Sequence, residues 1–488
     1  MKFNIFVILS SLFLLLSCDQ TTINQSKKLD ITFDKKYKNS GCSLIYNDDL
    51  KIKKIEDVSK LLEKGQLCPE ELTRFYLDKI YSDSRSKNVF TSVLKKSALE
   101  SAKESKKRAK LGLRKGVLDG IPISVKDLAD IEGELTRGGS SLTNKKKAKK
   151  NAVFIDELQS QGVIILGKTH MTELAFSGLG LNTITATPAN PFNEELVSGG
   201  SSSGSAVSVS RNYCIGSIGS DTGGSVRIPA AWNNLVGLKT THNLIDLTGV
   251  LKLCPSFDTL GPICKNVDDT HLLFHAMKKG KFQKLKKYQA SDFKFLIIKN
   301  MFFDNIDSEI NDSFNSAIER IIKNGAKVEY KSISEIDNAL EISKIVFPAE
   351  AYGMWQQEIE KSPEKMFAPI RERFRSGQLI LAHDYVFSLQ QLFEFRMSFL
   401  KKIMGFDAIL APTSPIKPPR ITKLIDDHDL FTEKNLLALR NTRIANSLNL
   451  CALTLPTETD FSGLMIMRPP NNEFDLMSIG LTIEKIIK

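Results

Sequence analysis

The most constraining feature of this sequence is the stretch 198–226, in which 17 of 29 positions are Gly or Ser. Such a composition is typical of flexible linkers, but the runs Ala206–Val209 and Tyr213–Ile218 interleave apolar residues that would pack. A phosphate-binding loop is also disfavoured, because the stretch has neither a G-K-[ST] ending nor a G-x-G-x-x-G pattern. The stretch therefore indicates a packed site where the backbone approaches a reacting group and several hydroxyls lie nearby.

The segment 221–225 reads DTGGS and lies between a strand-like run and Arg227, where a helix or turn is expected to begin. Glycines at these positions let successive backbone N–H groups turn toward one point, which is what stabilising an oxyanion requires. Ser225 ends the turn and is the candidate nucleophile.

A serine hydroxyl is a weak nucleophile at neutral pH and needs a base. The six His residues are scattered and none belongs to a recognisable motif. Lys126 ends the apolar, strand-like run Ile121–Val125. Burial of its amine would favour the neutral form and lower the pKa toward a useful range. Lys126 is therefore the candidate base.

Three segments together, GIPISVKD at 120–127, SGGSSSGSAV at 198–207 and GSDTGGSVRIPA at 219–230, resemble the amidase signature family. Lys126, Ser201 and Ser225 are 75 and 24 residues apart, which fits that family's Ser-Ser-Lys triad. The resemblance covers roughly residues 50–488. It implies that Ser225 attacks an amide carbonyl to form an acyl-enzyme, and that Ser201, following a cis Gly200–Ser201 peptide, relays the proton to Lys126.

The resemblance also implies an oxyanion hole and a set of supporting residues. The oxyanion hole would consist of the N–H groups of Thr222, Gly223, Gly224 and Ser225, and the supporting residues would be Ser202, Asp221 and Arg227. We expect no metal and no cofactor, since no Cys or His pair has ligand spacing. One departure stands out: Ser203 occupies a position where the family usually has glycine, and its side chain could crowd the turn or point outward.

Short apolar runs alternate with helical segments from residue 117 onward, as at 121–125, 163–166 and 213–218. This alternation predicts an α/β fold with one large sheet. Apolar spacing predicts helices over 52–65, 69–83 and about 97–110. The Lys-rich stretches 278–287 and 420–435 are expected to be exposed connections, with a long helical region between them. The family resemblance implies a large mixed central sheet covered by helices on both faces, in a single domain over 46–488 with its signature core at about 117–262.

The first residues are typical of a secretory signal, with Lys2 followed by an apolar run that is shorter than a membrane span. The run ends in Leu15–Cys18, which resembles the lipobox of bacterial lipoproteins. That resemblance implies removal of a signal peptide at 1–17, acylation of Cys18 with chains such as palmitate, and a location in the bacterial cell envelope. The polar segment 18–45 would begin with the lipidated Cys and continue as a flexible tether.

The net charge of +11 comes largely from scattered Lys residues, so a nucleic-acid partner is not expected. The expected partners are a small-molecule or peptide amide substrate and the membrane that holds the anchor, with the oligomeric state left open. After cleavage six cysteines would remain, and an oxidising compartment would permit disulfides whose pairing stays open.

The expected activity is hydrolysis of a carboxylic acid amide to a carboxylate and ammonia or an amine. One alternative is the glutaminase component of a tRNA-dependent amidotransferase, which the lipobox disfavours because that complex works beside cytosolic tRNA. A second is an inactive, membrane-displayed binding protein, which the intact triad disfavours. Arg371, Arg373 and Arg375 could bind a substrate carboxylate, although structural or surface roles are favoured for each.

Overall fold

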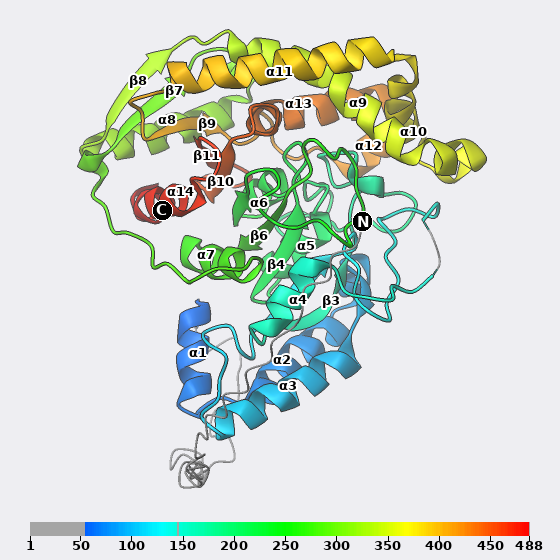
Figure 1. Ribbon diagram of the computed structural model, residues 1–488, viewed down its shortest axis with the longest axis vertical. Helices are drawn as coiled ribbons and strands as arrows, with labels where there is room; N and C mark the ends of the chain where they lie inside the picture. Colours follow the sequence, from blue (N-terminus) through cyan, green and yellow to red (C-terminus); the bar gives the residue numbers. More distant parts are fainter. Residues whose placement is uncertain (1–53, 144–145, 488) are drawn as a thin grey trace, which may run out of the picture.

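The computed structural model describes residues 54–143 and 146–487. The predicted signal peptide, Cys18 and the tether lie outside these ranges. A single sheet of eleven strands crosses the described part of the chain, in the order β1-β3-β2-β4-β6-β5-β10-β11-β9-β7-β8 (Figure 1). The strands are β1 (Phe90–Val93), β2 (Pro122–Lys126), β3 (Ile164–Thr169), β4 (Gly216–Ser220), β5 (Val236–Lys239), β6 (Leu260–Cys264), β7 (Lys294–Ile298), β8 (Lys327–Lys331), β9 (Ala408–Pro412), β10 (Cys451–Pro456) and β11 (Gly463–Arg468).

The sheet is mixed. Strand β2 is parallel to both β3 and β4, and β7 is parallel to both β8 and β9. The pairs across the centre of the sheet, from β4 through β6, β5, β10 and β11 to β9, are antiparallel. The carboxyl ends of β2 and β4 therefore meet at one edge, which is where Lys126 and Asp221 lie.

Helices cover the sheet on both faces, as predicted (Figure 1). They are α1 (Ile55–Glu63), α2 (Pro69–Ser82), α3 (Lys95–Lys110), α4 (Val153–Ser160), α5 (Ser203–Ser210), α6 (Arg227–Trp232), α7 (Val267–Ala276), α8 (Ser308–Lys323), α9 (Glu335–Lys361), α10 (Ala368–Arg375), α11 (Ala382–Lys402), α12 (Ile421–Asp426), α13 (His428–Ser447) and α14 (Glu473–Ile487).

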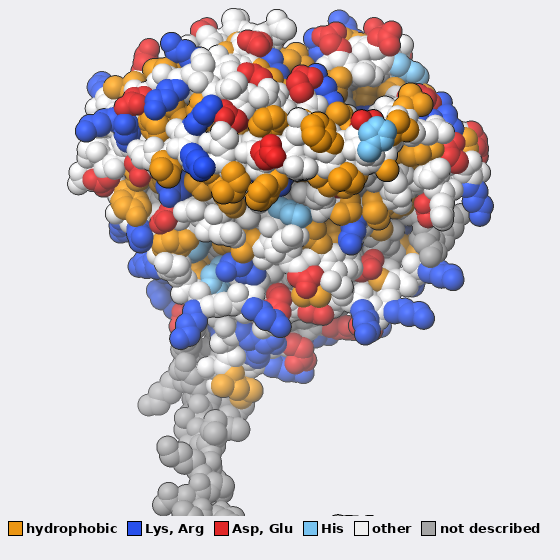
Figure 2. Space-filling view, turned by 45° about the horizontal axis from the view of Figure 1, so that its top comes forward, with side chains coloured by type: hydrophobic (Ala, Val, Ile, Leu, Met, Phe, Trp, Pro, Cys, Tyr) orange, Lys and Arg blue, Asp and Glu red, His pale blue; other side chains and the backbone are white. Residues whose placement is uncertain are grey.

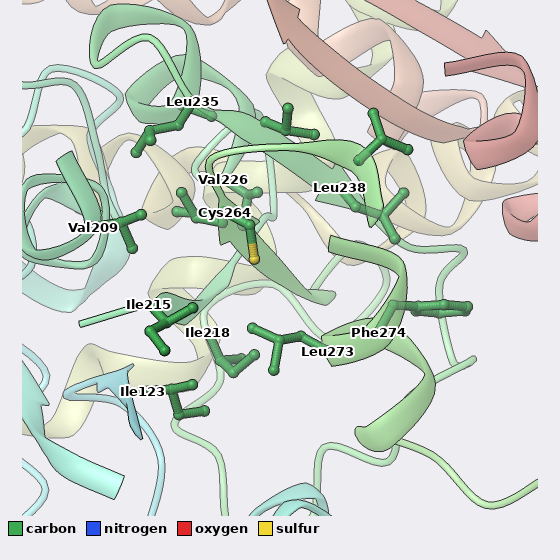
Figure 3. Packing of buried hydrophobic residues seen from close by; sticks show 14 of the residues in the cluster. Ile123, Val209, Ile215, Ile218, Val226, Leu235, Leu238, Cys264, Leu273 and Phe274 are labelled. Atoms are coloured by element: carbon green, nitrogen blue, oxygen red, sulfur yellow. The ribbon is translucent and has the colours of Figure 1, made fainter. Parts of the chain in front are cut away.

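Two hydrophobic cores fill the space between the sheet and the helices, one on each face of the sheet. Successive side chains of a strand point to opposite faces, so neighbouring residues of one strand enter different cores. Ala408 and Leu410 of β9 belong to the core that includes α7, α8 and α14. Ile409 and Ala411 of the same strand belong to the core that includes α9 to α13. Figure 3 shows the first core beneath β4 to β6, where side chains of these strands meet α7. The site is thus held on a sheet that is packed on both sides.

Most of the predicted elements are present. Helices α1, α2 and α3 and strands β2 and β3 lie where the apolar spacing indicated. The prediction that 420–435 is an exposed connection is wrong, because this stretch forms α12 and the start of α13. Leu424 and Phe431 within it are buried, so its charged residues mark the outer face of helices and not a loop.

The long predicted helical region corresponds to α9, α10 and α11, preceded by β7, α8 and β8. Of its aromatic residues, Phe374 and Phe399 are buried in the core, whereas Phe393 is 62% exposed on α11. Among the described cysteines, Cys214, Cys254, Cys264 and Cys451 are free and buried, and Cys68 is disulfide-bonded.

Candidate active site

Lys126 is the last residue of β2, and its side chain is almost completely enclosed, with 1% of the residue exposed. Its Nζ donates a hydrogen bond of 2.7 Å to Ser201 Oγ and another of 2.7 Å to Ser220 Oγ. Both partners are hydroxyls, so no carboxylate forms a salt bridge with this amine in the described part of the chain. Ser220 ends β4, the parallel neighbour of β2.

Burial lowers the pKa of Lys126 to about 7, and the nearby charges of Asp221 and Asp258 oppose this shift. Removing an ammonium group from water disfavours its charged form. Neither carboxylate bonds to the amine directly, so burial prevails. A lysine in this state is neutral in a large fraction of molecules near pH 7, and it can accept a proton from a hydroxyl.

Ser201 follows a cis peptide bond with Gly200, as the resemblance to the family implied. The N–H of Thr172 donates to the Ser201 carbonyl oxygen at 3.1 Å, which fixes the backbone here. The next residue, Ser202, donates its N–H to the Ser225 carbonyl oxygen at 3.2 Å. The two serine-bearing segments are therefore side by side, although the hydrogen bonds among the described residues do not include a direct one between the hydroxyls of Ser201 and Ser225.

Close backbone approach explains one glycine of the Gly- and Ser-rich stretch. A β-carbon at Gly219 would lie 2.6 Å from Ser202 Oγ, which leaves no room for a side chain. The Ser202 hydroxyl instead packs against β4, where it donates to the Ser220 carbonyl oxygen and accepts from the Ser220 N–H. Ser202 thus ties the start of α5 to the end of the strand beside Lys126.

Asp221 organises the turn that carries Ser225. Its carboxylate accepts hydrogen bonds from the N–H groups of Gly224 (2.9 Å) and Val226 (3.2 Å). Arg227 binds both carboxylate oxygens at 2.9 Å in a fully buried pair. Burial alone would raise the pKa of Asp221, but Arg227 outweighs it and holds the value at about 2. The turn is therefore built around a permanent negative charge.

The N–H of Gly224 is bound by Asp221 and does not point toward the pocket, in contrast to the expectation from sequence. The N–H groups of Thr222, Gly223 and Ser225 have no acceptor among the described residues. These three residues lie in a small pocket in which Ser225 is only 3% exposed. The pocket is lined by Ala175, Phe176, Ser177, Thr222, Gly223, Ser225, Leu253, Phe347, Arg373, Leu439 and Arg443.

Several site residues were missed by sequence reasoning. Ser220 Oγ accepts a hydrogen bond from the same Lys126 amine that bonds to Ser201. The Asp258 carboxylate accepts a hydrogen bond of 2.6 Å from the Thr222 hydroxyl. On α13, Thr442 donates to the Gly223 carbonyl oxygen at 2.8 Å, and Asn446 donates to Asp221. Ser220 could have been found from its place at the end of a strand parallel to β2. The α13 residues lie more than 200 positions away from the turn and carried no local signal.

Ser203 does not point outward. It is the first residue of α5, fully buried, and its hydroxyl bonds to no described residue. Of the three arginines singled out, Arg371 donates to Glu372 and to the Pro363 carbonyl oxygen, and Arg375 pairs with Glu360. Of these three, Arg373 alone lines the pocket.

The sequence is similar to known proteins over most of its length. Residues 71–477 match the model of the family described as Amidase. The chain is 31% identical over 382 residues to 2-amino-5-chloromuconic acid deaminase of Comamonas testosteroni, covering 76% of this chain and 82% of that protein. It is 30% identical over 403 residues to a glutamyl-tRNA(Gln) amidotransferase subunit of Ruminiclostridium cellulolyticum, covering 74% and 82%.

Solved structures share the fold. A crystal structure of an amidase superposes with a TM-score of 0.80 at 24% identity, covering 89% of this chain and all of that one. Fatty acid amide hydrolase superposes with a TM-score of 0.80 at 19% identity, covering 89% and 85%. Since the family model spans most of the sequence, the chain belongs to the amidase family and is a hydrolase that acts on carboxamide C–N bonds.

Proposed function

We propose that this protein hydrolyses its amide substrate through an acyl-enzyme on Ser225, with Lys126 as base and Ser201 as the proton relay. The observation that carries the proposal is the position of the buried Lys126 amine, whose Nζ lies 2.7 Å from Ser201 Oγ. The backbone hydrogen bond from the Ser202 N–H to the Ser225 carbonyl oxygen holds the two serine-bearing segments side by side. A neutral amine has two N–H groups and one lone pair. When Ser220 accepts from one N–H, the lone pair is free to accept the proton of Ser201.

In the first half of the reaction, Ser225 Oγ bonds to the amide carbon and passes its proton to Ser201 Oγ, whose own proton moves to Lys126 Nζ. Negative charge gathers on the carbonyl oxygen, and the N–H groups of Thr222, Gly223 and Ser225 would stabilise it. Loss of one such donor typically raises the barrier by about 3 kcal/mol. The C–N bond then breaks, and the leaving nitrogen takes a proton back from Ser201 while Lys126 returns one to Ser201.

In the second half, a water molecule attacks the ester carbon of the acyl-enzyme and gives its proton to the same relay. The Ser225–acyl bond breaks, Ser225 recovers its proton from the relay, and the carboxylic acid product leaves and loses its proton to solvent. Both halves use one base that must be neutral at the start. The pKa of about 7 for Lys126 supports this requirement.

The glutaminase alternative receives support from the relatives named as subunits of glutamyl-tRNA(Gln) amidotransferase. Glutamine carries an α-ammonium group, which needs a carboxylate or several acceptors when it is buried. The lining of the pocket at Ser225 contains two arginines and no Asp or Glu among the described residues. We therefore favour an amidase that acts on substrates without a free ammonium group near the amide.

We further propose that the protein is a lipoprotein of the bacterial cell envelope, with an acylated Cys18 and the amidase domain outside the cytoplasm. The sequence Leu15–Cys18 and the disulfide at Cys68 support this location, since disulfides persist in oxidising compartments. None of the helices within 54–143 and 146–487 is long and apolar enough to cross a bilayer. No nucleic-acid partner is proposed, because the charge is scattered.

The first experiment would use the full chain in detergent, with the variants Ser225→Ala, Ser201→Ala and Lys126→Ala. Release of ammonia or amine from a panel of aliphatic, aryl and peptide amides would be followed, together with labelling of Ser225 by a fluorophosphonate. We expect turnover to be lost in all three variants while each keeps its unfolding temperature close to that of the parent. Ser225→Ala that still hydrolyses the amide, or an unlabelled Ser225 in the parent protein, would rule out this mechanism.

A further inference from the structure

Two arginines in the lining of the pocket at Ser225 have no acidic partner among the described residues. Arg443, on α13, is 7% exposed and forms no hydrogen bond or ion pair with any described residue, and its Nη2 is fully enclosed. Arg373, on α10, is partly buried, and it donates one hydrogen bond of 2.7 Å to the Phe176 carbonyl oxygen. Both guanidinium groups also face aromatic rings, those of Phe347 and Phe176.

Arg443 differs in this respect from Arg227, the other arginine that is buried among the described residues, because Arg227 is paired with Asp221. Arg373 is partly buried, as are Arg396, Arg440 and Arg468, which bond to backbone carbonyl oxygens and to no described carboxylate. Taking a guanidinium group out of water is unfavourable unless an anion or several acceptors replace the water. Two neighbouring cations that lack an anion repel each other, and burial together with this proximity lowers the pKa of Arg373 to about 9. The balancing negative charge is expected to come from a ligand.

The position of the two arginines relative to the reacting groups is set by α13. Leu439 and Arg443 are four residues apart and lie on the same side of that helix. A β-carbon at Gly223 would lie 3.7 Å from the Leu439 side chain and 3.8 Å from the Phe347 ring. The wall beside the oxyanion turn is therefore apolar, and Arg443 follows one helical turn further along. A second hollow of about 520 Å³ shares Phe176, Phe347, Arg373 and Arg443 with the pocket, and Glu372 and Asp429 are also among the residues that line it.

We propose that the substrate is an amide that carries a carboxylate, and that Arg373 and Arg443 together bind this carboxylate while Ser225 attacks the amide; the proposal rests on the function proposed above. Guanidinium groups match the two oxygens of a carboxylate in a planar arrangement. The apolar wall formed by Leu439 and Phe347 fits a short hydrocarbon link between amide and acid. The carboxylate can belong to the acyl part, as in the monoamide of a dicarboxylic acid, or to the amine part, as in an N-acyl amino acid.

The test compares substrates that differ only in charge. Monoamides of succinic, glutaric and adipic acid would be assayed beside the corresponding diamides, in which a neutral amide replaces the carboxylate. N-acetylglycine and N-acetyl-β-alanine would be compared with the corresponding compounds in which a neutral amide replaces the carboxylate. This pair of comparisons tests substrates whose carboxylate belongs to the amine part. We expect kcat/KM for the preferred acid to exceed that of its neutral partner by about 30-fold or more, since removing one partner of an enclosed charge pair has at least that effect.

Arg443→Met and Arg373→Met should each reduce this preference for the acid, mainly through KM, and Arg443→Lys should restore part of it. Arg420→Gln is the matched control, because Arg420 is an exposed arginine that pairs with Glu195 away from the pocket. It should leave the preference for the acid at the parent value. Equal kcat/KM for acid and neutral amide in the parent, or an unchanged preference in Arg443→Met, would overturn the proposal while leaving the Ser225 mechanism intact.

A second readout does not depend on turnover. Succinate, glutarate or adipate should slow the labelling of Ser225 by a neutral fluorophosphonate in the parent protein and in Arg420→Gln, but not in Arg443→Met. If none of these diacids slows the labelling of Ser225, the carboxylate site is contradicted. This result holds even if the amides tested are not substrates. A parent protein that is neither labelled nor active on any amide would instead refute the proposed function itself.

Discussion

The amine of Lys126 has a pKa of about 7 because it is buried and bonded only to hydroxyls. We predict that kcat/KM rises with pH and levels off above about pH 7. In the proposed mechanism the neutral amine is the active form, so each pH unit below the pKa should reduce the rate roughly tenfold. The measurement is kcat/KM from pH 5 to 9 on a substrate that does not titrate in this range.

Asp258 provides a control for this assignment. Its negative charge raises the pKa of Lys126, and its own pKa is raised to about 6 by burial. Asp258→Asn should therefore shift the midpoint of the pH profile toward acid. A profile that is flat from pH 5 to 9, or a midpoint that moves toward alkali in this variant, would contradict the role of Lys126 as a neutral base.

At the scale of single residues, the sequence singled out the proposed reactive groups, and the structure brings Lys126 within hydrogen-bond distance of Ser201. Lys126, Ser201 and Ser225 stand in short motifs whose residue types report their chemistry directly. Arg443 stands in an ordinary helical sequence, and only the packing of α13 against the turn brings it to the pocket. Arg373 was singled out together with two neighbours, and only its orientation on α10 distinguishes it from Arg371 and Arg375.

At the scale of elements, α6 and α13 fix the turn between β4 and α6. The link between them is the buried pair of Asp221 and Arg227, whose guanidinium also donates to the Thr442 carbonyl oxygen and to Asn446. The sequence predicted the strands and helices of this region from apolar spacing. It could not predict which later helix would complete the turn, because contacts across more than 200 residues leave no local pattern.

We predict that Asp221→Asn lowers the free energy of unfolding by about 3–5 kcal/mol, because Arg227 would remain buried without its counter-charge. Activity should fall sharply as well, since the same carboxylate binds two N–H groups of the turn that carries Ser225. Urea unfolding would measure the loss of stability. Turnover at urea concentrations below the unfolding transition would measure the loss of activity.

Asp119→Asn is the matched control for this prediction, because Asp119 is buried, pairs with Arg108 and lies away from the turn. It should lower stability without changing the turnover of the folded protein. If Asp221→Asn were as active as Asp119→Asn at equal fractions folded, the turn would not depend on the buried charge.

At the scale of the whole molecule, Figure 2 shows Lys and Arg side chains interspersed with Asp and Glu over one face, among exposed apolar side chains. The basic side chains therefore form no single basic stripe on this face. We predict that attachment to the membrane depends on acylation of Cys18 and not on these basic side chains. Two or more acyl chains hold a protein far more firmly than scattered lysines do.

The variant Cys18→Ala tests this prediction in cells of a bacterial host that processes lipoproteins. The parent protein should incorporate labelled palmitate and partition into the detergent phase of a Triton X-114 extract, whereas Cys18→Ala should do neither. Lys146→Ala and Lys147→Ala, which remove exposed charges on the domain, should partition like the parent. A parent protein found in the aqueous phase without palmitate would refute the anchor.

The tie between the turn at Ser225 and α13 has a consequence for biosynthesis. Arg227 and Asn446 are 219 positions apart, so the ribosome completes Lys126, Ser201 and Ser225 long before it reaches the helix that holds them in place. A nascent chain, or one cut short before α13, carries every reactive group but lacks the framework that aligns them. We therefore expect the chain to gain hydrolase activity only after α13 has packed against the turn at Ser225.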